Sequence, residues 1–142
     1  MSSRRYPQAA VSVVLRDRAS GAFLLARRAR PPAADLWAFP GGRVKWGETI
    51  RQAAAREIAE ETAMRLDPDS LALAEVVDLI GDENHDGAPD HHFVLTVFTG
   101  RAEGSPRAGD DAAELRFVTV EEMASLPMTA TTLATARRLA AR

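Results

Sequence analysis

Residues 42–64 read GRVKWGETIRQAAAREIAEETAM, and this segment restricts the fold more than any other part of the chain. The adjacent glycines Gly41 and Gly42 permit a tight turn and a close approach of the backbone to a ligand. Thr49, with Gln52 three residues later, has the pattern of a capping box, which marks the start of a helix. We therefore predict a glycine turn that leads into one helix over Thr49–Ala63.

Three carboxylates share one face of this predicted helix. At about 100° per residue, Glu57, Glu60 and Glu61 fall within an arc of roughly 100°. Carboxylates at this spacing repel one another, and those near the C-terminal end also oppose the helix dipole. A divalent cation reverses both effects, because Mg²⁺ and Mn²⁺ bind converging carboxylate oxygens. The alternative is a solvated helix with exposed ion pairs, such as Arg56 with Glu60.

The spacing of the segment resembles the Nudix box, G-x5-E-x7-R-E-U-x-E-E-x-G-U, in which U is a bulky apolar residue. One position departs from this pattern: Ala63 stands where the family usually has glycine. Glycine at the end of a helix commonly adopts a left-handed conformation, so alanine predicts a slightly different helix exit. The departure removes no carboxylate. The matching positions are Gly42, Glu48, Arg56, Glu57, Ile58, Glu60, Glu61 and Met64.

The resemblance implies hydrolysis of a diphosphate linkage in a nucleoside diphosphate derivative, such as ADP-ribose, another nucleotide sugar or a (d)NTP. It also implies a requirement for Mg²⁺ or Mn²⁺. The alternative function is a non-catalytic Nudix-like sensor that binds a nucleotide. Sensors of this kind usually have an eroded box, whereas the box of this chain is nearly complete.

By position in the motif, the resemblance implies that Glu57, Glu60 and Glu61, with the Gly41 carbonyl, hold the metal. Arg56 in the family orients a catalytic glutamate through charge-assisted hydrogen bonds. Glu57, Glu60 and Arg56 are therefore also our candidates for catalysis. Glu48 lies before the helix, and both a structural role and direct ligation of the metal stay open.

The general base is either a glutamate of the box or an acid from a later segment. The later candidates are Asp110, Asp111 and Glu114, and we choose Asp111 for the catalytic set. The alternative interpretation of these three residues is an acidic surface turn.

The candidates for substrate binding lie around the glycine turn. Arg27 ends a predicted strand and is a candidate for a phosphate or a base edge, or else an exposed charge at a strand end. Trp46 lies in the variable part of the box and is a candidate for stacking on a nucleobase. Gly41 and Gly42 let the backbone approach the substrate. The Leu126–Thr131 segment lacks the asparagine with which MutT-like enzymes read a purine, which argues against strict recognition of 8-oxo-dGTP.

The composition is that of a globular protein. The chain has 142 residues, no cysteine and a formal net charge of −2, so it has no overall basic field to hold polymeric nucleic acid. Its N-terminus does not have the pattern of a signal peptide, and no apolar run reaches the ~18 residues of a membrane span. We expect one cytoplasmic domain over 1–142 that binds a small nucleotide, without nucleic acid or membrane partners. A homodimer stays open.

The rest of the pattern predicts an α/β (α+β) sandwich with a mixed sheet between helices. The resemblance implies the same Nudix-type α/β/α arrangement. A polar segment, Gly81–Asp90, begins like an EF-hand calcium loop but has Phe93 in place of the final glutamate, so we predict a solvated hairpin loop near the mouth of the site. The remaining predicted elements are strands over Ala9–Arg16, Phe23–Arg27, Leu36–Phe39, Leu71–Leu79, His92–Thr99 and Leu115–Val120, and a helix over Thr129–Arg142.

Overall fold

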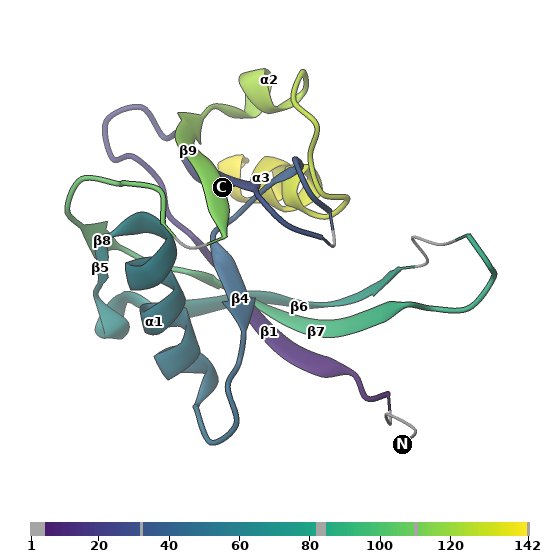
Figure 1. Cartoon of the computed structure of the whole chain (residues 1–142). Helices are drawn as coiled ribbons and strands as arrows, with labels where there is room; N and C mark the ends of the chain where they lie inside the picture. The colour runs from purple at the N-terminus through teal and green to yellow at the C-terminus, as the bar shows by residue number, and fades with distance from the viewer. Residues whose placement is uncertain (1–4, 32, 82–84, 110, 142) are drawn as a thin grey trace.

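The computed structural model describes residues 5–31, 33–81, 85–109 and 111–141. Within these described residues, three helices and three sheets form a layered sandwich (Figure 1). The elements in chain order are β1 (Gln8–Val14), β2 (Phe23–Arg28), β3 (Trp37–Ala38), β4 (Gly41–Arg43), α1 (Ile50–Thr62), β5 (Arg65–Leu66), the 3-10 turn η1 (Pro68–Ser70), β6 (Ala72–Gly81), β7 (His91–Thr99), β8 (Ala102–Glu103), β9 (Ala112–Val118), α2 (Val120–Met123) and α3 (Thr132–Ala140).

The largest sheet is mixed and has the strand order β4-β1-β7-β6. Its central strands β1 and β7 run parallel, while β4 and β6 pair antiparallel to them at the two edges. The second sheet, β3-β2-β9, is antiparallel, and the short strands β5 and β8 form a third. The sequence predicted the mixed sheet between helices, which is confirmed, but it did not predict the second sheet as a separate layer.

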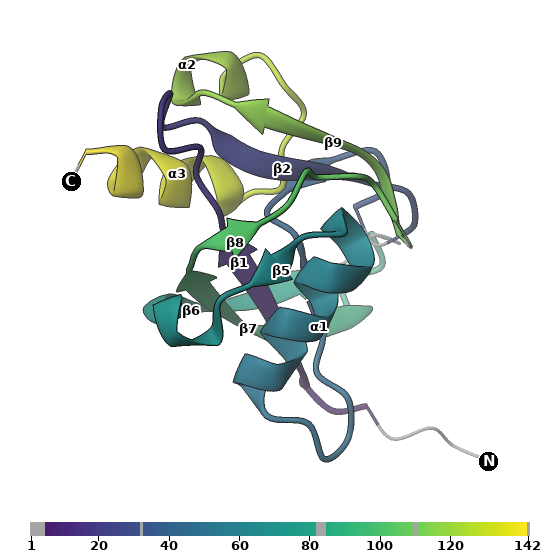
Figure 2. The same ribbon diagram turned by 90° about the vertical axis from the view of Figure 1, so that its left-hand side faces the viewer.

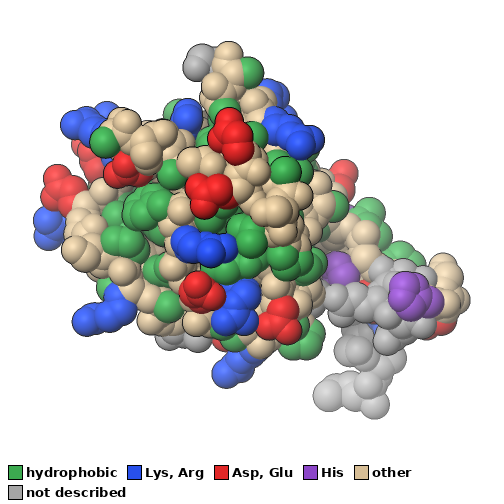
Figure 3. All heavy atoms as spheres, turned by 90° about the horizontal axis from the view of Figure 1, so that it is seen from above, with side chains coloured by type: hydrophobic (Ala, Val, Ile, Leu, Met, Phe, Trp, Pro, Cys, Tyr) green, Lys and Arg blue, Asp and Glu red, His purple; other side chains and the backbone are tan. Residues whose placement is uncertain are grey.

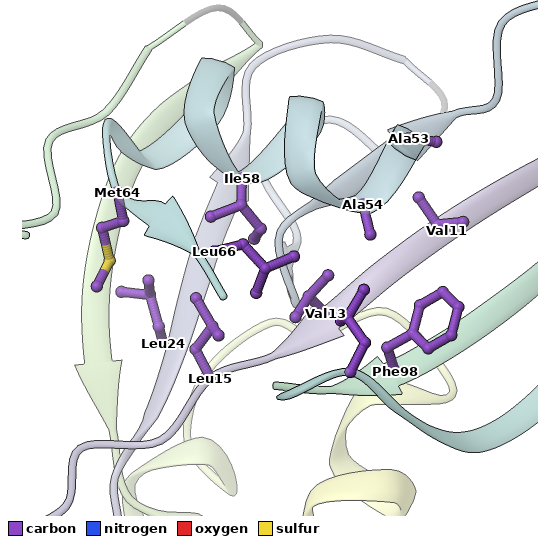
Figure 4. Packing of buried hydrophobic residues seen from close by; sticks show 11 residues of the cluster. Val11, Val13, Leu15, Leu24, Ala53, Ala54, Ile58, Met64, Leu66 and Phe98 are labelled. Atoms are coloured by element: carbon purple, nitrogen blue, oxygen red, sulfur yellow. The ribbon is translucent and has the colours of Figure 1, made fainter. Parts of the chain in front are cut away.

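The mixed sheet lies between α1 on one face and the second sheet with α3 on the other (Figures 1 and 2). Side chains alternate across β1: Val11 and Val13 join the core under α1, whereas Val14 joins the core on the α3 side. Figure 4 shows Ala53, Ala54 and Ile58 of α1 over this first core. The small alanines let the helix approach the sheet closely, so α1 is held rigidly against β1.

The β6–β7 hairpin extends well beyond the body of the molecule (Figure 1). Viewed from above, this arm projects to one side and carries the histidine side chains, while charges of both signs cover the body (Figure 3). The described part of the loop, residues 85–90, lies at the tip of the arm and so away from α1. The prediction that this loop lies near the mouth of the site is wrong, and its residues 82–84 lie outside the described residues.

The predicted elements all occur, with ends that shift by a few residues. The largest shifts are three residues: β9 begins at Ala112 instead of Leu115 and so includes Glu114, and α3 begins at Thr132 instead of Thr129. In the described part of the chain, no helix is both long enough and apolar enough to cross a membrane. The sequence pattern missed β4, β5, β8, α2 and η1, which are all four residues or shorter.

Candidate metal centre and active site

The helix that carries the carboxylates begins as predicted. The Thr49 side chain accepts a hydrogen bond from the Gln52 backbone N–H at 3.0 Å, and the Gln52 side chain accepts from the Thr49 N–H at 2.9 Å. At the other end, Ala63 adopts φ 60° and ψ 13°, and its N–H donates to the Ala59 carbonyl. The helix exit is therefore left-handed, as a glycine would make it, and the prediction of a different exit is wrong. The Met64 N–H, which donates to the buried Thr62 hydroxyl, helps to hold this conformation.

The glycine turn brings strand β4 against the acidic face of α1. A side chain at Gly42 would place its Cβ 2.5 Å from Oε1 of Glu57, so only glycine leaves room for this carboxylate. The Gly41 N–H donates to Oε2 of Glu61 at 2.9 Å. The two glycines therefore position two glutamates that lie one helical turn apart on α1.

Arg56 is the centre of the acidic network. Its guanidinium binds both oxygens of Glu48, at 2.7 and 2.9 Å, and reaches Oε1 of Glu57 at 2.8 Å. It also donates to Oε2 of Glu60 at 3.1 Å and to the Arg43 carbonyl at 2.9 Å. The guanidinium is only 19% exposed, and Glu57 only 13%. This arrangement differs from the solvated helix alternative, in which Arg56 would pair with Glu60 alone at the surface.

The Glu48 carboxylate is held in its charged form. The hydrogen bonds from Arg56, followed by the one from the Lys45 N–H, lower the pKa of Glu48 to about 2. The hydrogen bond with Glu48 in turn raises the pKa of Arg56 above its ordinary value. Glu48 binds two of the three guanidinium nitrogens, Nε and Nη2. It therefore fixes the plane of the group, in which the third nitrogen, Nη1, faces Glu57.

Glu61 is the buried carboxyl group of the site. Burial raises its pKa to about 8, and the hydrogen bond from the Gly41 N–H opposes that rise. Nearby negative charges on Glu57 and Asp111 raise the pKa further, whereas Arg28 lowers it. A bound cation would remove this penalty by pairing with the ionised carboxylate.

The donor set fits a hard divalent cation. Glu57, Glu60 and Glu61 supply carboxylate oxygens from one face of α1. Within the described residues, no three acidic, histidine or cysteine side chains already converge at metal-binding distance. The reason is that Glu57 and Glu60 point to Arg56, and Glu61 points to the Gly41 N–H.

The segment before β9 brings Asp111 toward this centre. The backbone N–H of Arg107 donates to the Thr62 carbonyl at 2.7 Å, and that of Gly109 donates to the Glu61 carbonyl at 3.0 Å. Asp111, two residues after Gly109, is 62% exposed, with Oδ1 3.3 Å from Nε of Arg30. The segment thus caps the C-terminal carbonyls of α1 and places an accessible carboxylate beside the glutamates. Asp110 lies outside the described residues.

Arg27 lies between two carboxylates in the second sheet. Its guanidinium is 3.1 Å from Oδ1 of Asp35 and 3.4 Å from Oε1 of Glu114. Asp35 holds a positive φ of 66°, which is rare outside glycine. Trp46 is fully exposed in the turn before α1, whereas Phe39 is buried in the core.

The NUDIX domain family profile matches residues 6–139. The chain belongs to the Nudix family. It is 34% identical over 105 residues to the ADP-ribose pyrophosphatase of Methanocaldococcus jannaschii. The aligned residues make up 72% of this chain and 57% of that protein. It is 31% identical over 94 residues to the 8-oxo-dGTP diphosphatase of Escherichia coli K12, with 66% of each chain covered. The chain therefore spans less than two thirds of the length of either relative.

The Nudix fold is equally clear from solved structures. The crystal structure of a MutT NUDIX hydrolase from Burkholderia pseudomallei matches 95% of this chain and 99% of its own with a TM-score of 0.82 and 28% identity. The mixed sheet, the second sheet and the helix of the box are thus parts of a known architecture.

Several residues of this Nudix site were absent from the sequence prediction. The Arg43 carbonyl accepts a hydrogen bond from Arg56, and Asp35 accepts one from Arg27. Both contacts form only in the folded chain, and no nearby sequence pattern indicates them. Gly109 is a glycine in an acidic run, which signals a turn but not contact with α1.

Proposed function

We propose that this Nudix domain hydrolyses a diphosphate linkage in a nucleoside diphosphate derivative with the help of Mg²⁺ or Mn²⁺. The observation that carries the proposal is the buried Glu61 carboxyl group beside Glu57, at a glycine turn where Gly42 leaves room for Glu57 and the Gly41 N–H binds Glu61. Such a pair is unfavourable without a cation, because two carboxylates in a region of low dielectric repel each other.

Glu57, Glu60 and Glu61, with the Gly41 carbonyl, would hold the metal. When bound, the cation neutralises adjacent phosphates and makes a bound water a better nucleophile. Glu60 is 39% exposed, more than Glu57, so it would contact the metal from the solvent side. Glu57 accepts from Arg56 through Oε1, so it would contact the metal through Oε2 while Arg56, held by Glu48, keeps it oriented.

Asp111 is our candidate for the general base. In the reaction, a water oxygen forms a bond to one phosphorus while the bridging P–O bond breaks, and the bridging oxygen leaves on the other phosphate. Asp111 would accept the proton of the water, since its carboxylate is exposed and lies close enough to Glu61 to raise the pKa of that residue. Glu60 is the competing base, because it is the most exposed carboxylate of the box.

Arg27, Trp46, Gly41 and Gly42 are the proposed substrate contacts. Arg27 is restrained by carboxylates, so a substrate phosphate would have to replace Asp35 as its partner. The fully exposed Trp46 offers a ring for stacking, and the glycines leave the backbone accessible. One relative is named for hydrolysis of ADP-ribose and the other for hydrolysis of 8-oxo-dGTP. The substrate class we propose therefore includes ADP-ribose, other nucleotide sugars and (d)NTPs. A cytoplasmic location and a single domain over 1–142 stay predictions.

The test is turnover of a nucleotide panel with and without metal. We expect release of phosphate products with Mg²⁺ or Mn²⁺ and none after chelation. Glu57→Gln and Glu61→Gln should each lower kcat by about 10²-fold or more, because each removes a charged metal ligand. Glu103→Gln, an exposed glutamate of β8 paired with Arg65, is the matched control and should retain full activity. Nucleotide binding by the wild type without turnover would contradict the proposal and indicate the sensor alternative.

A further inference from the structure

The β6–β7 arm carries an exposed apolar surface. Leu73, Val76 and Ile80 of β6 are 63%, 56% and 57% exposed, and Val94 of β7 lies beside them at 37%. We call these four residues the arm face. Isolated exposed apolar residues are ordinary in monomers, but several on one face of one hairpin indicate an interaction surface.

The strand register places the arm face on the α1 side of the mixed sheet. Phe98, which packs under α1, pairs with Leu73, and going outward Thr96 pairs with Val76. The next pair on the same face is Val94 with Asp78. The helix covers β1 and the inner end of β7 but not the arm, so this face is apolar where nothing in the described chain lies over it.

The strand that carries this face is also an edge strand. β6 pairs with β7 on one side, and in the described residues no strand pairs with it on the other. It is ten residues long, and natural edge strands with apolar faces are usually shortened, charged or covered because they associate. The described chain itself offers no such cover, so the partner is another molecule.

The charges beside the arm face favour a second copy of this chain. Arg51 lies at its inner end, with the guanidinium 5.7 Å from the Phe98 ring and a hydrogen bond of 3.4 Å to the Leu71 carbonyl. Asp78 lies toward its outer end, exposed, between Val76 and Ile80 on the same face. One end is thus basic and the other acidic, which is the pattern that a two-fold axis makes self-complementary.

We propose that two copies of this chain associate through the arm face, packed face to face about a two-fold axis near Val76. On the ladder, Leu73 pairs with Phe98, Val76 with Thr96 and Asp78 with Val94, so Leu73 and Asp78 lie about 7 Å from Val76 on either side. The two-fold therefore sets Val76 of each copy against Val76 of the other, and Asp78 of each copy over the Leu73–Phe98 pair of the other, where Arg51 lies. It also brings Arg51 close to Asp78 of the second copy. The inference is independent of the proposed function, since none of these residues belongs to the metal centre.

The test is the molar mass of the whole chain in solution, measured by light scattering and sedimentation over a range of concentrations. We expect a dimer for the wild type. Val76→Glu should make it monomeric, since it places two like charges at the axis. Circular dichroism checks that this variant is folded, and its side chain is exposed, so the fold should be unchanged.

A charge exchange tests the register. Arg51→Glu and Asp78→Arg should each raise the dimer dissociation constant by about tenfold, and the double variant should return it to near the wild-type value. Arg65→Glu, an exposed charge reversal on β5, is the control and should leave the dimer unchanged. A monomeric wild type, or a dimer that tolerates Val76→Glu, would overturn the proposal. Dimerisation that ignores the charge exchange would also overturn it and would fit pairing of β6 edge to edge.

Discussion

Ala63 ends α1 in a conformation that costs an alanine free energy. Its φ of 60° and ψ of 13° lie in the left-handed region, where the Cβ of an L-residue crowds the backbone. The side chain is exposed, so its methyl group contributes no packing in the core. Replacement by glycine therefore removes the strain and loses no contact.

The magnitude follows from two opposing terms. The left-handed conformation costs a non-glycine residue about 1–2 kcal/mol. Glycine offsets about 0.4–1 kcal/mol of this gain in stability, because the unfolded chain gains conformational freedom. We expect Ala63→Gly to raise the free energy of unfolding by roughly 0.5–1 kcal/mol. In a domain of this size, this corresponds to an increase in Tm of about 1–4 °C.

The assay is urea and thermal unfolding of the metal-free protein. Ala59→Gly is a matched control, because it makes the same chemical change at an exposed position inside α1, one turn before the helix exit. There glycine should lower stability by roughly 1 kcal/mol. The two variants should thus move in opposite directions. If Ala63→Gly destabilises the protein as Ala59→Gly does, the left-handed exit and the reasoning built on it are refuted.

Two further predictions concern the segment before β9 and the acid sensitivity of the fold. Gly109→Ala places a Cβ 2.5 Å from the Glu60 carbonyl and should lower kcat. If the segment acts by positioning Asp111, this change should not lower kcat further in an Asp111→Asn variant, and steady-state kinetics of the double variant measure this. Gly100→Ala, where the new Cβ would meet only ends of side chains at 3.2 Å, should be nearly neutral. The lowered pKa of Glu48 means that its carboxylate stabilises the fold above its ordinary pKa of 4.5 and ceases to do so as the pH falls through about 2. Thermal unfolding of Glu48→Gln should accordingly lose less stability than the wild type between pH 5 and pH 2, and an equal loss would contradict the assigned role.

Local sequence was sufficient for the helix of the box. The capping pair Thr49 and Gln52 begins α1, because both hydrogen bonds join residues three apart. The order of the longer strands also followed from β-branched runs between turns. The shortest strands did not: β4 contains two glycines, which have low strand propensity, and it exists because β1 provides its partner.

The sequence by itself determined which groups the site contains and that the three box carboxylates share one helical face. Tertiary structure decided their environments. Glu61 is buried because β4 folds over α1 from another part of the chain, and the guanidinium of Arg56 meets the Arg43 carbonyl for the same reason. It also decided that the polar loop lies at the end of an arm and that an apolar face stays uncovered there. These properties depend on contacts between residues that are not neighbours in sequence, and a local pattern of residue types does not predict the energies of such contacts.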